Sequence, residues 1–249
     1  MTNINMIFIA NWKMNGEKKH ISDIYKTIHF SKKSKNKKIK IVYCPPYTLI
    51  SKIRNKVKNT NIKVGAQNIH YINDYGAFTG LINSKLIKSA GADYVIIGHS
   101  ENRSFESDLI INKKIISALK ENLKVIFCIG ETYKEKKNNI TFRVLKRQIS
   151  IALKNIKKIN NIIFAYEPRW AIGTGKLPNL AELNKNINYI NNLISETKKK
   201  QTYKIIYGGS VNSENVSELL KIKDLKGFLI GSASLKSKNF IDIIKKSIN

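Results

Sequence analysis

The sequence has few of the residues that mark secreted or metal-binding proteins. Its 249 residues include only two cysteines, Cys44 and Cys128, and neither lies in a CxxC pattern. At most one disulfide could form, so we expect a reduced, cytoplasmic protein. The four histidines show no metal-ligand spacing, which argues against zinc.

Long hydrophobic segments are also absent. The first apolar run, residues 6–10, is followed directly by the polar stretch Asn11-Trp12-Lys13. It is too short for the apolar core of a signal peptide and far too short to span a bilayer. No Ser/Gly/Pro-rich linker divides the chain. The sequence therefore predicts a globular protein without membrane segments, built as one domain over residues 1–249.

Acidic residues are scarce: 17 Asp and Glu stand against 45 Lys and Arg, which gives a net charge of +28. Such a charge suggests nucleic-acid binding. Only five of the basic residues are Arg, however, and no aromatic residues are interleaved with the lysines to stack on bases. Lys, Ile and Asn all have A/T-rich codons, so codon bias accounts for the excess. We interpret the lysines as solvated surface that also attracts an anionic substrate, and we expect no specific nucleic-acid partner.

One unit recurs along the chain: a short β-branched run, a loop and an amphipathic helical stretch. The helical stretches include residues 108–121, 180–197 and 213–220. The first six β-branched runs are mostly apolar, as in strands buried on both faces. The predicted strands are residues 6–10, 39–43, 62–65, 94–97, 125–129, 162–166, 205–207 and 227–230.

Eight consecutive units favour an α/β fold of the single-domain, closed (β/α)8-barrel class. A doubly wound open sheet is the alternative. Such a sheet usually has a Gly-rich turn after its first strand, where this sequence reads Asn11-Trp12-Lys13-Met14-Asn15-Gly16. In a barrel, functional residues are expected at the C-terminal ends of the strands.

Two of these strand ends carry polar residues with ambiguous meaning. Alternation along the first strand places Asn11 and Lys13 on one face, but in a chain with so many lysines a single one is usually a surface residue. His99 follows the fourth strand in Gly98-His99-Ser100-Glu101. It is either a core histidine with satisfied hydrogen bonds, or an electrophile or general acid whose pKa is lowered by a following helix N-terminus.

The sixth strand ends at Glu167. Burying an ionised carboxylate there is costly, so Glu167 either points to solvent or has a raised pKa and works as a base. The following loop, residues 168–178, has a proline at each end, internal glycines and apolar residues, which are features of a lid that excludes water. Its Gly175-Lys176 pair is not part of a P-loop, because Trp170 replaces the first Gly of that motif and Leu177 replaces its Ser/Thr.

The seventh and eighth strands end in Gly208-Gly209-Ser210 and Gly231-Ser232. In (β/α)8 barrels these two loops often bind phosphate through backbone N–H groups. A carboxylate base, an imidazole donor, a nearby lysine, a lid and a phosphate site suit proton abstraction next to the carbonyl of a small phosphorylated compound. No cofactor motif accompanies them, so we expect none to be needed.

The sequence resembles the triosephosphate isomerase family in a set of motifs that keep the family's order and cover nearly the whole chain. These are Asn11-Trp12-Lys13-Met14-Asn15, Gly65-Ala66-Gln67-Asn68, Gly76-Ala77-Phe78-Thr79-Gly80, Gly98-His99-Ser100-Glu101, Cys128-Ile129-Gly130-Glu131, residues 166–176 and Tyr207-Gly208-Gly209-Ser210.

The resemblance implies a role for each matched residue. Glu167 moves a proton between C1 and C2 of the triose, and uncharged His99 donates a hydrogen bond to the carbonyl oxygen. Lys13 and Asn11 hold the substrate and stabilise the enediolate, while Glu101 supports Lys13. Ile172 and Leu229 press on Glu167 when the lid closes. The backbone N–H groups expected to bind the phosphate are those of Gly173, Ser210, Gly231 and Ser232.

The resemblance also implies a homodimer. The loop from Gln67 to Leu81 would dock beside the partner's active site, with Thr79 near the partner's Lys13. Two positions depart from the family there: Leu81 stands where a Glu is usual, and Asn102 where an Arg is usual. We hypothesise that both members of one charge pair have been lost, because losing both costs less than stranding one.

Three further departures concern the phosphate site and the lid. Ser232 replaces a Gly in the eighth loop, so its added Cβ could shift the phosphate, whereas Arg169 and Pro178 replace the usual residues at the hinges of the lid. Two alternatives remain open. Another phosphate-binding barrel, such as a sugar-phosphate epimerase or a synthase, lacks this motif set, and a basic nucleic-acid-binding barrel predicts steeply salt-dependent duplex binding.

Overall fold

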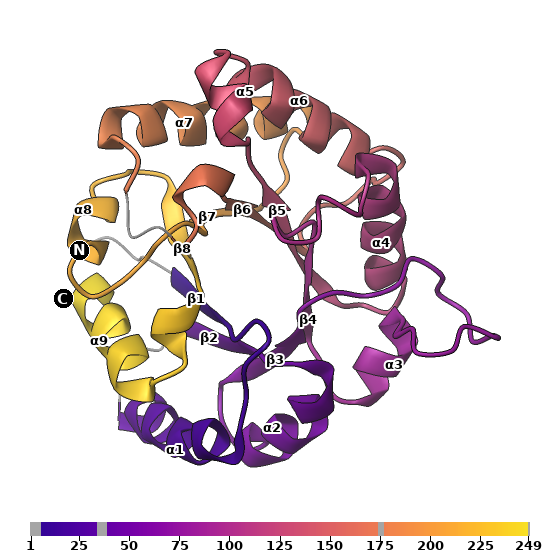
Figure 1. Cartoon of the computed structure of the whole chain (residues 1–249), viewed down its shortest axis with the longest axis vertical. Coiled ribbons are helices and arrows are strands. Elements are labelled where there is room, and N and C mark those ends of the chain that lie inside the picture. The colour runs from indigo at the N-terminus through magenta and orange to yellow at the C-terminus, as the bar shows by residue number, and fades with distance from the viewer. Residues whose placement is uncertain (1–5, 34–38, 174–176, 249) are drawn as a thin grey trace.

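The computed structural model describes residues 6–33, 39–173 and 177–248. Its eight strands pair in sequence order, β1 to β8, and β8 returns to β1, so that the sheet closes into a barrel of parallel strands. Figure 1 shows the helices as an outer ring around these strands. This arrangement confirms the predicted (β/α)8, or TIM, barrel and excludes the open doubly wound sheet.

All eight predicted strands are present, with bounds within two residues of those expected. They are β1 (Met6–Asn11), β2 (Ile39–Cys44), β3 (Lys63–Ala66), β4 (Tyr94–Ile97), β5 (Lys124–Ile129), β6 (Ile162–Tyr166), β7 (Lys204–Tyr207) and β8 (Leu225–Ile230). The helices are α1 (Lys18–Lys33), α2 (Ile50–Val57), α3 (Ser84–Ser89), α4 (Asp108–Lys120), α5 (Tyr133–Lys137), α6 (Thr141–Ala152), α7 (Leu180–Thr197), α8 (Val216–Leu219) and α9 (Ser237–Ile248). Short 3-10 turns are η1 (Tyr47–Leu49), η2 (Arg169–Ala171) and η3 (Ser232–Ser234).

One helix is shorter than predicted: α8 covers Val216–Leu219 and not the expected 213–220. Two asparagines before it explain the difference. The Asn212 side chain accepts hydrogen bonds from the backbone N–H groups of Glu214 and Asn215, both at 2.9 Å. Side chains that bond to nearby backbone in this way compete with helix formation. None of the described helices combines the length and apolar character needed to cross a bilayer.

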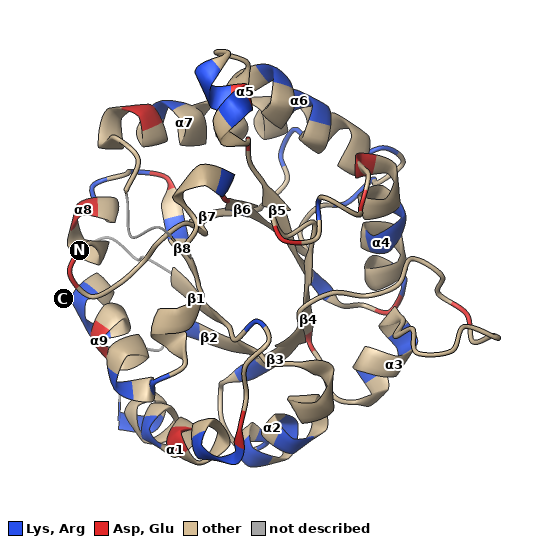
Figure 2. Ribbon diagram, viewed as in Figure 1, with Lys and Arg blue, Asp and Glu red and all other residues tan. Residues whose placement is uncertain are grey.

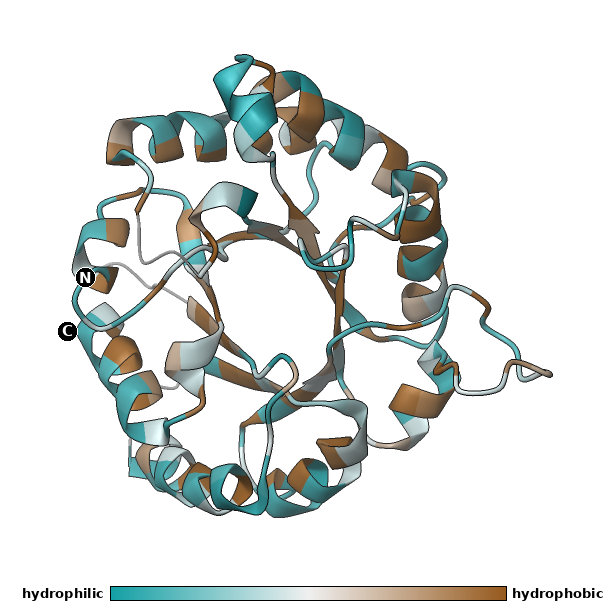
Figure 3. Cartoon of the chain, in the orientation of Figure 1, coloured by the Kyte–Doolittle hydropathy of each residue, from teal (hydrophilic) through white to brown (hydrophobic). Residues whose placement is uncertain are grey.

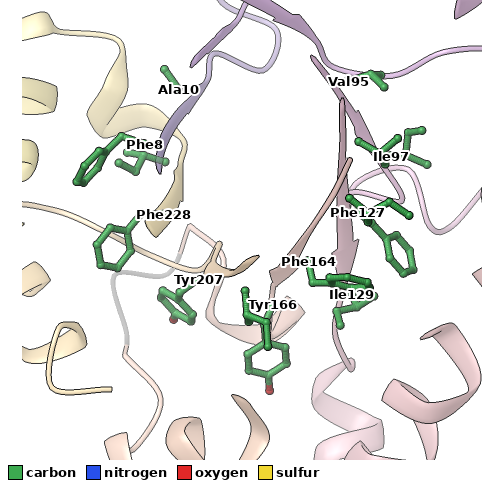
Figure 4. Close-up of a cluster of buried hydrophobic side chains, with 14 of the residues drawn as sticks. Phe8, Ala10, Val95, Ile97, Phe127, Ile129, Phe164, Tyr166, Tyr207 and Phe228 are labelled. Atoms are coloured by element: carbon green, nitrogen blue, oxygen red, sulfur yellow. The ribbon is translucent and has the colours of Figure 1, made fainter. Parts of the chain in front are cut away.

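Strand alternation divides the buried residues into two cores. One set fills the barrel interior and includes Ile9, Val42 and Ile126. The larger set packs between the strands and the helices, and Figure 4 shows side chains such as Phe127 and Phe164 leaving the strands on that outer side. Figure 3 shows the complementary pattern on the helices, whose hydrophobic segments alternate with hydrophilic ones. Burial of the strands on both faces explains why they appear in the sequence as mostly apolar runs.

Candidate active site

A cavity of about 480 Å³ opens at the C-terminal ends of the strands. This is the end of the barrel at which the sequence predicts function. Nearly all the predicted site residues line it, from β1, β4, β6, β7 and β8. They are Asn11, Lys13, His99, Glu167, Ile172, Gly173, Ser210, Leu229, Gly231 and Ser232. Glu101 lies in an adjoining cavity that shares Lys13.

Lys13 is held at both its backbone and its side chain. Its φ of 51° is unusual for a residue with a Cβ. The Asn11 carboxamide oxygen accepts a hydrogen bond from the Lys13 N–H at 3.1 Å, and the Gln67 amide donates to the Lys13 carbonyl at 2.8 Å. Its Nζ lies 2.6 Å from Glu101 Oε1. The ammonium group therefore stands at the cavity wall in a fixed position.

His99 is buried, with 5% of its surface exposed. The backbone N–H of Glu101 donates to His99 Nδ1 at 3.3 Å. A nitrogen that accepts a hydrogen bond carries no proton, so the ring hydrogen of this arrangement sits on Nε2 and points into the cavity. The helix that follows His99, α4, begins only at Asp108, because the N–H groups of Asn102 and Arg103 bond back to the His99 carbonyl in a turn.

Glu167 does not point to solvent, since only 1% of its surface is exposed. Its Oε2 accepts a hydrogen bond from the Ser100 N–H at 3.2 Å, and its Oε1 lies 3.4 Å from His99 Nε2. Within the described part of the chain, Oε1 is buried and has no hydrogen-bond partner. A buried polar atom at a cavity wall is available to a ligand.

Two glycines make room for Glu167. A Cβ at Gly208 would come within 2.7 Å of Glu167 Cγ, so a side chain there would displace the carboxylate. A Cβ at Gly130 would lie 1.9 Å from the Glu167 carbonyl oxygen, which is impossible without moving the backbone. The ends of β5, β6 and β7 therefore approach closely because of glycine.

The residues expected to bind phosphate all line this cavity. The Ser210 hydroxyl donates to the Ala171 carbonyl at 2.9 Å, which joins the seventh loop to the start of the predicted lid. Ser232 begins the 3-10 turn η3, whose leading N–H groups have no partner inside the turn. Of the lid motif, Thr174, Gly175 and Lys176 lie outside the described residues.

Glu131 ends the motif Cys128-Ile129-Gly130-Glu131, and the sequence alone predicts no role for it. Its fully buried carboxylate accepts hydrogen bonds from Tyr166 Oη at 3.0 Å and from Trp170 Nε1 at 2.9 Å. Burial raises the pKa of Glu131, although the hydrogen bonds from Trp170 and Tyr166 oppose the rise. Asn186 of α7 donates to Tyr166 Oη at 2.8 Å. Glu131 therefore anchors the first turn of the lid to the barrel.

Pro178, one of the positions that depart from the family, lies at the far end of the lid. It directly precedes Asn179, whose side chain caps α7 by accepting from the N–H groups of Ala181 and Glu182.

Among the described residues, no group of three or more His, Cys, Asp or Glu side chains could hold a metal ion.

The closed barrel and the polar cavity at its C-terminal end define an enzyme of the (β/α)8-barrel class. The sequence model described as "Triosephosphate isomerase" matches residues 6–247. The chain belongs to the triosephosphate isomerase family. It is an isomerase that interconverts D-glyceraldehyde 3-phosphate and dihydroxyacetone phosphate, a step of glycolysis.

Individual relatives agree with this assignment over almost the whole chain. The triosephosphate isomerase of Alkaliphilus oremlandii is 41% identical over 245 residues, which cover 96% of this chain and 98% of the relative. That of Clostridium botulinum (strain Okra / Type B1) is 39% identical with the same coverage. The crystal structure of the Bartonella henselae triosephosphate isomerase superposes with a TM-score of 0.90 at 34% identity, covering 99% of this chain and all of that one.

Proposed function

We propose that Glu167 is the base of the isomerisation. Its buried Oε1 faces the cavity 3.4 Å from His99 Nε2, and this pairing of carboxylate and imidazole is the observation that carries the proposal. Glu167 takes the proton from C1 of dihydroxyacetone phosphate, which leaves an enediolate, and returns it to C2 to give the aldehyde. A carboxylate within reach of both carbons suits this transfer.

His99 and Lys13 stabilise the charge that develops on the substrate oxygens. The Nε2 hydrogen of His99 bonds to the carbonyl oxygen and helps to move the hydroxyl proton to it. Lys13 supplies positive charge beside the enediolate, Glu101 keeps the ammonium in place at 2.6 Å, and Asn11 orients both substrate and backbone. Charges held in advance stabilise a transition state without further reorganisation.

The phosphate of the substrate binds in the same cavity. Backbone N–H groups from the lid and from the seventh and eighth loops bind it. Ile172 and Leu229 line the same cavity as Glu167 and press on its carboxylate when the lid closes, which excludes water. The binding N–H groups are those of Gly173, Ser210, Gly231 and Ser232.

A coupled assay of glyceraldehyde 3-phosphate conversion tests the base directly. We expect Glu167→Gln to lower kcat by about 10²–10⁴-fold, the usual contribution of a general base. Glu214→Gln makes the same change at an exposed position and should leave kcat unchanged. A Glu167→Gln enzyme with wild-type kcat would exclude Glu167 as the base.

We also propose that the chain is one cytoplasmic domain, residues 1–249, that works as a homodimer through the loop from Gln67 to Leu81. Tyr75, Phe78 and Leu81 expose 68%, 44% and 47% of their surfaces in this loop, which projects between β3 and α3 in Figure 1. Exposed apolar patches of this kind favour association. Both cysteines are free and buried, which suits a reducing compartment.

Sedimentation velocity tests the dimer and the idea of a lost charge pair. Wild type should sediment as a dimer, and Asn102→Arg should not tighten it, because Leu81 offers the new guanidinium no carboxylate. A monomer at every concentration would refute the dimer, and a markedly lower dissociation constant for Asn102→Arg would refute the lost pair.

A further inference from the structure

Lysine side chains surround the N-terminal mouth of the barrel, the end opposite the active site. β2, β5 and β7 carry Lys40, Lys124 and Lys204 at their first or second residue. Each lysine lies two residues before a side chain of the interior core, so strand alternation turns all three toward the barrel axis. The interior residues concerned are Val42, Ile126 and Ile206.

The three lysines meet at one recess. A cavity of about 140 Å³ at this mouth is lined by Lys40, Lys124 and Lys204 together with neutral polar and apolar side chains. Figure 2 shows basic residues on strands of the barrel ring as well as on the outer helices. Lys40 and Lys204 are partly buried there, and Lys124 is exposed at its rim. The neutral polar residues of the recess are Asn160, Asn161, Thr202 and Tyr203.

Burial and neighbouring positive charges both act on the lysines at this mouth. Burial lowers the pKa of Lys40, and the charges of Lys124 and Lys63 lower it further. Burial also lowers the pKa of Lys204, followed by the charges of Lys40, Lys226 and Lys124. Like charges act in this direction because each disfavours a proton on the others.

The positive charges of Lys40 and Lys124 are not neutralised by neighbouring carboxylates in the described part of the chain. Over the described ranges 6–33, 39–173 and 177–248, neither Lys40 nor Lys124 forms an ion pair. The nearby Asp93 is engaged by Arg54, whose Nη1 lies 3.1 Å from it. Converging ammonium groups, hydrogen-bonding amides and a hydroxyl are the groups that bind phosphate oxygens.

We propose that the N-terminal mouth is a second anion site, which binds a small multivalent phosphate anion of the pyrophosphate type through Lys40, Lys124 and Lys204. The ligand is compact because the lysines converge on a recess. A nucleic-acid strand instead needs a basic groove with aromatic stacking platforms along it. Free pyrophosphate and the pyrophosphoryl group of a nucleotide share the required chemistry.

Thermal unfolding of the full chain at constant ionic strength tests the site. Pyrophosphate should raise the Tm of wild type more than that of Lys40→Gln/Lys124→Gln. The difference between the two Tm shifts should be about 2–4 °C at saturation. The matched control Lys146→Gln/Lys245→Gln removes the same charge from exposed positions on α6 and α9 and should respond like wild type. Binding in the active site contributes equally to all three proteins, so it cancels in the comparison.

Equal pyrophosphate responses in the three proteins would overturn the proposal. Equilibrium dialysis gives a second measurement: one pyrophosphate fewer per chain in Lys40→Gln/Lys124→Gln than in wild type supports the site, and equal numbers contradict it. ADP identifies the source, since an equal effect of ADP indicates a nucleotide and no effect indicates the free anion. A single-stranded oligonucleotide that raised the Tm more than pyrophosphate would overturn the choice of a small anion.

Discussion

The two ends of the barrel use the same residue type in opposite ways. At the C-terminal end, Lys13 is ion-paired with Glu101 at 2.6 Å, and its backbone is fixed by Asn11 and Gln67. At the N-terminal end, Lys40 has other lysines as its charged neighbours. A lysine therefore acquires a defined position from its partners, and where opposite charges are missing, repulsion dominates.

This contrast also changes the interpretation of the net charge of +28. The codon-bias hypothesis concerns how many lysines the chain has, and it does not explain where their charges meet. The strand starts tolerate lysine because a long side chain can place its ammonium at the open mouth of the barrel while its methylene groups stay packed. The strand ends instead hold buried groups close together, since Glu167 Oε1 and His99 Nε2 lie 3.4 Å apart.

The largest expected effect comes from making one substitution at both ends. Lys13→Gln should lower kcat by about 10²–10³-fold, the usual cost of removing one preorganised electrostatic stabiliser. Lys124→Gln removes the same charge at the far mouth and should change kcat by less than about twofold. The coupled isomerase assay measures both.

A similar loss in both variants would break the comparison, because the charge of the whole protein, and not the local geometry, would then control the rate. Ionic strength separates these causes: a field effect on substrate attraction weakens with salt, and the loss at Lys13 does not.

Much of the fold could be predicted because the sequence repeats one pattern eight times. The strand 162–166 and the helix 180–197 were predicted with their observed bounds. The helix at 213–220 was overextended, since apolar periodicity says nothing of the bonds that the Asn212 side chain makes to backbone. Glycine at 208 and 130 was visible in the sequence, but its reason, close approach to Glu167, depends on the register of β5, β6 and β7.

The site was predictable where a residue stood out at a strand end, as His99 and Glu167 do. Glu131 was not, because its partners Tyr166 and Trp170 lie 35 and 39 residues away along the chain. The cluster of lysines at the N-terminal mouth could not be predicted for the same reason. In the sequence Lys40, Lys124 and Lys204 resemble many other lysines, and only barrel closure brings them to one cavity.

A smaller effect should appear in stability. With no anion added, Lys40→Gln/Lys124→Gln should raise the Tm by about 1–3 °C at low salt, as expected for relief of under ~1 kcal/mol of repulsion at partly exposed groups. Added salt should reduce the gain through screening. Lys146→Gln/Lys245→Gln, at exposed helix positions, serves as the control and should gain less.

The gain should also depend on pH, with a definite sign. Because the folded state lowers the pKa of Lys40, it releases that proton at a lower pH than the unfolded chain does. Between the two pKa values the unfolded chain binds more protons, so the stability of wild type rises with pH. The double variant lacks Lys40 and loses this rise. Its Tm advantage should therefore shrink as the pH approaches about 10, where free lysine titrates. An advantage that grew with pH would mean that Lys40 is stabilised in its charged form, and the two ends of the barrel would then hold their lysines in the same way.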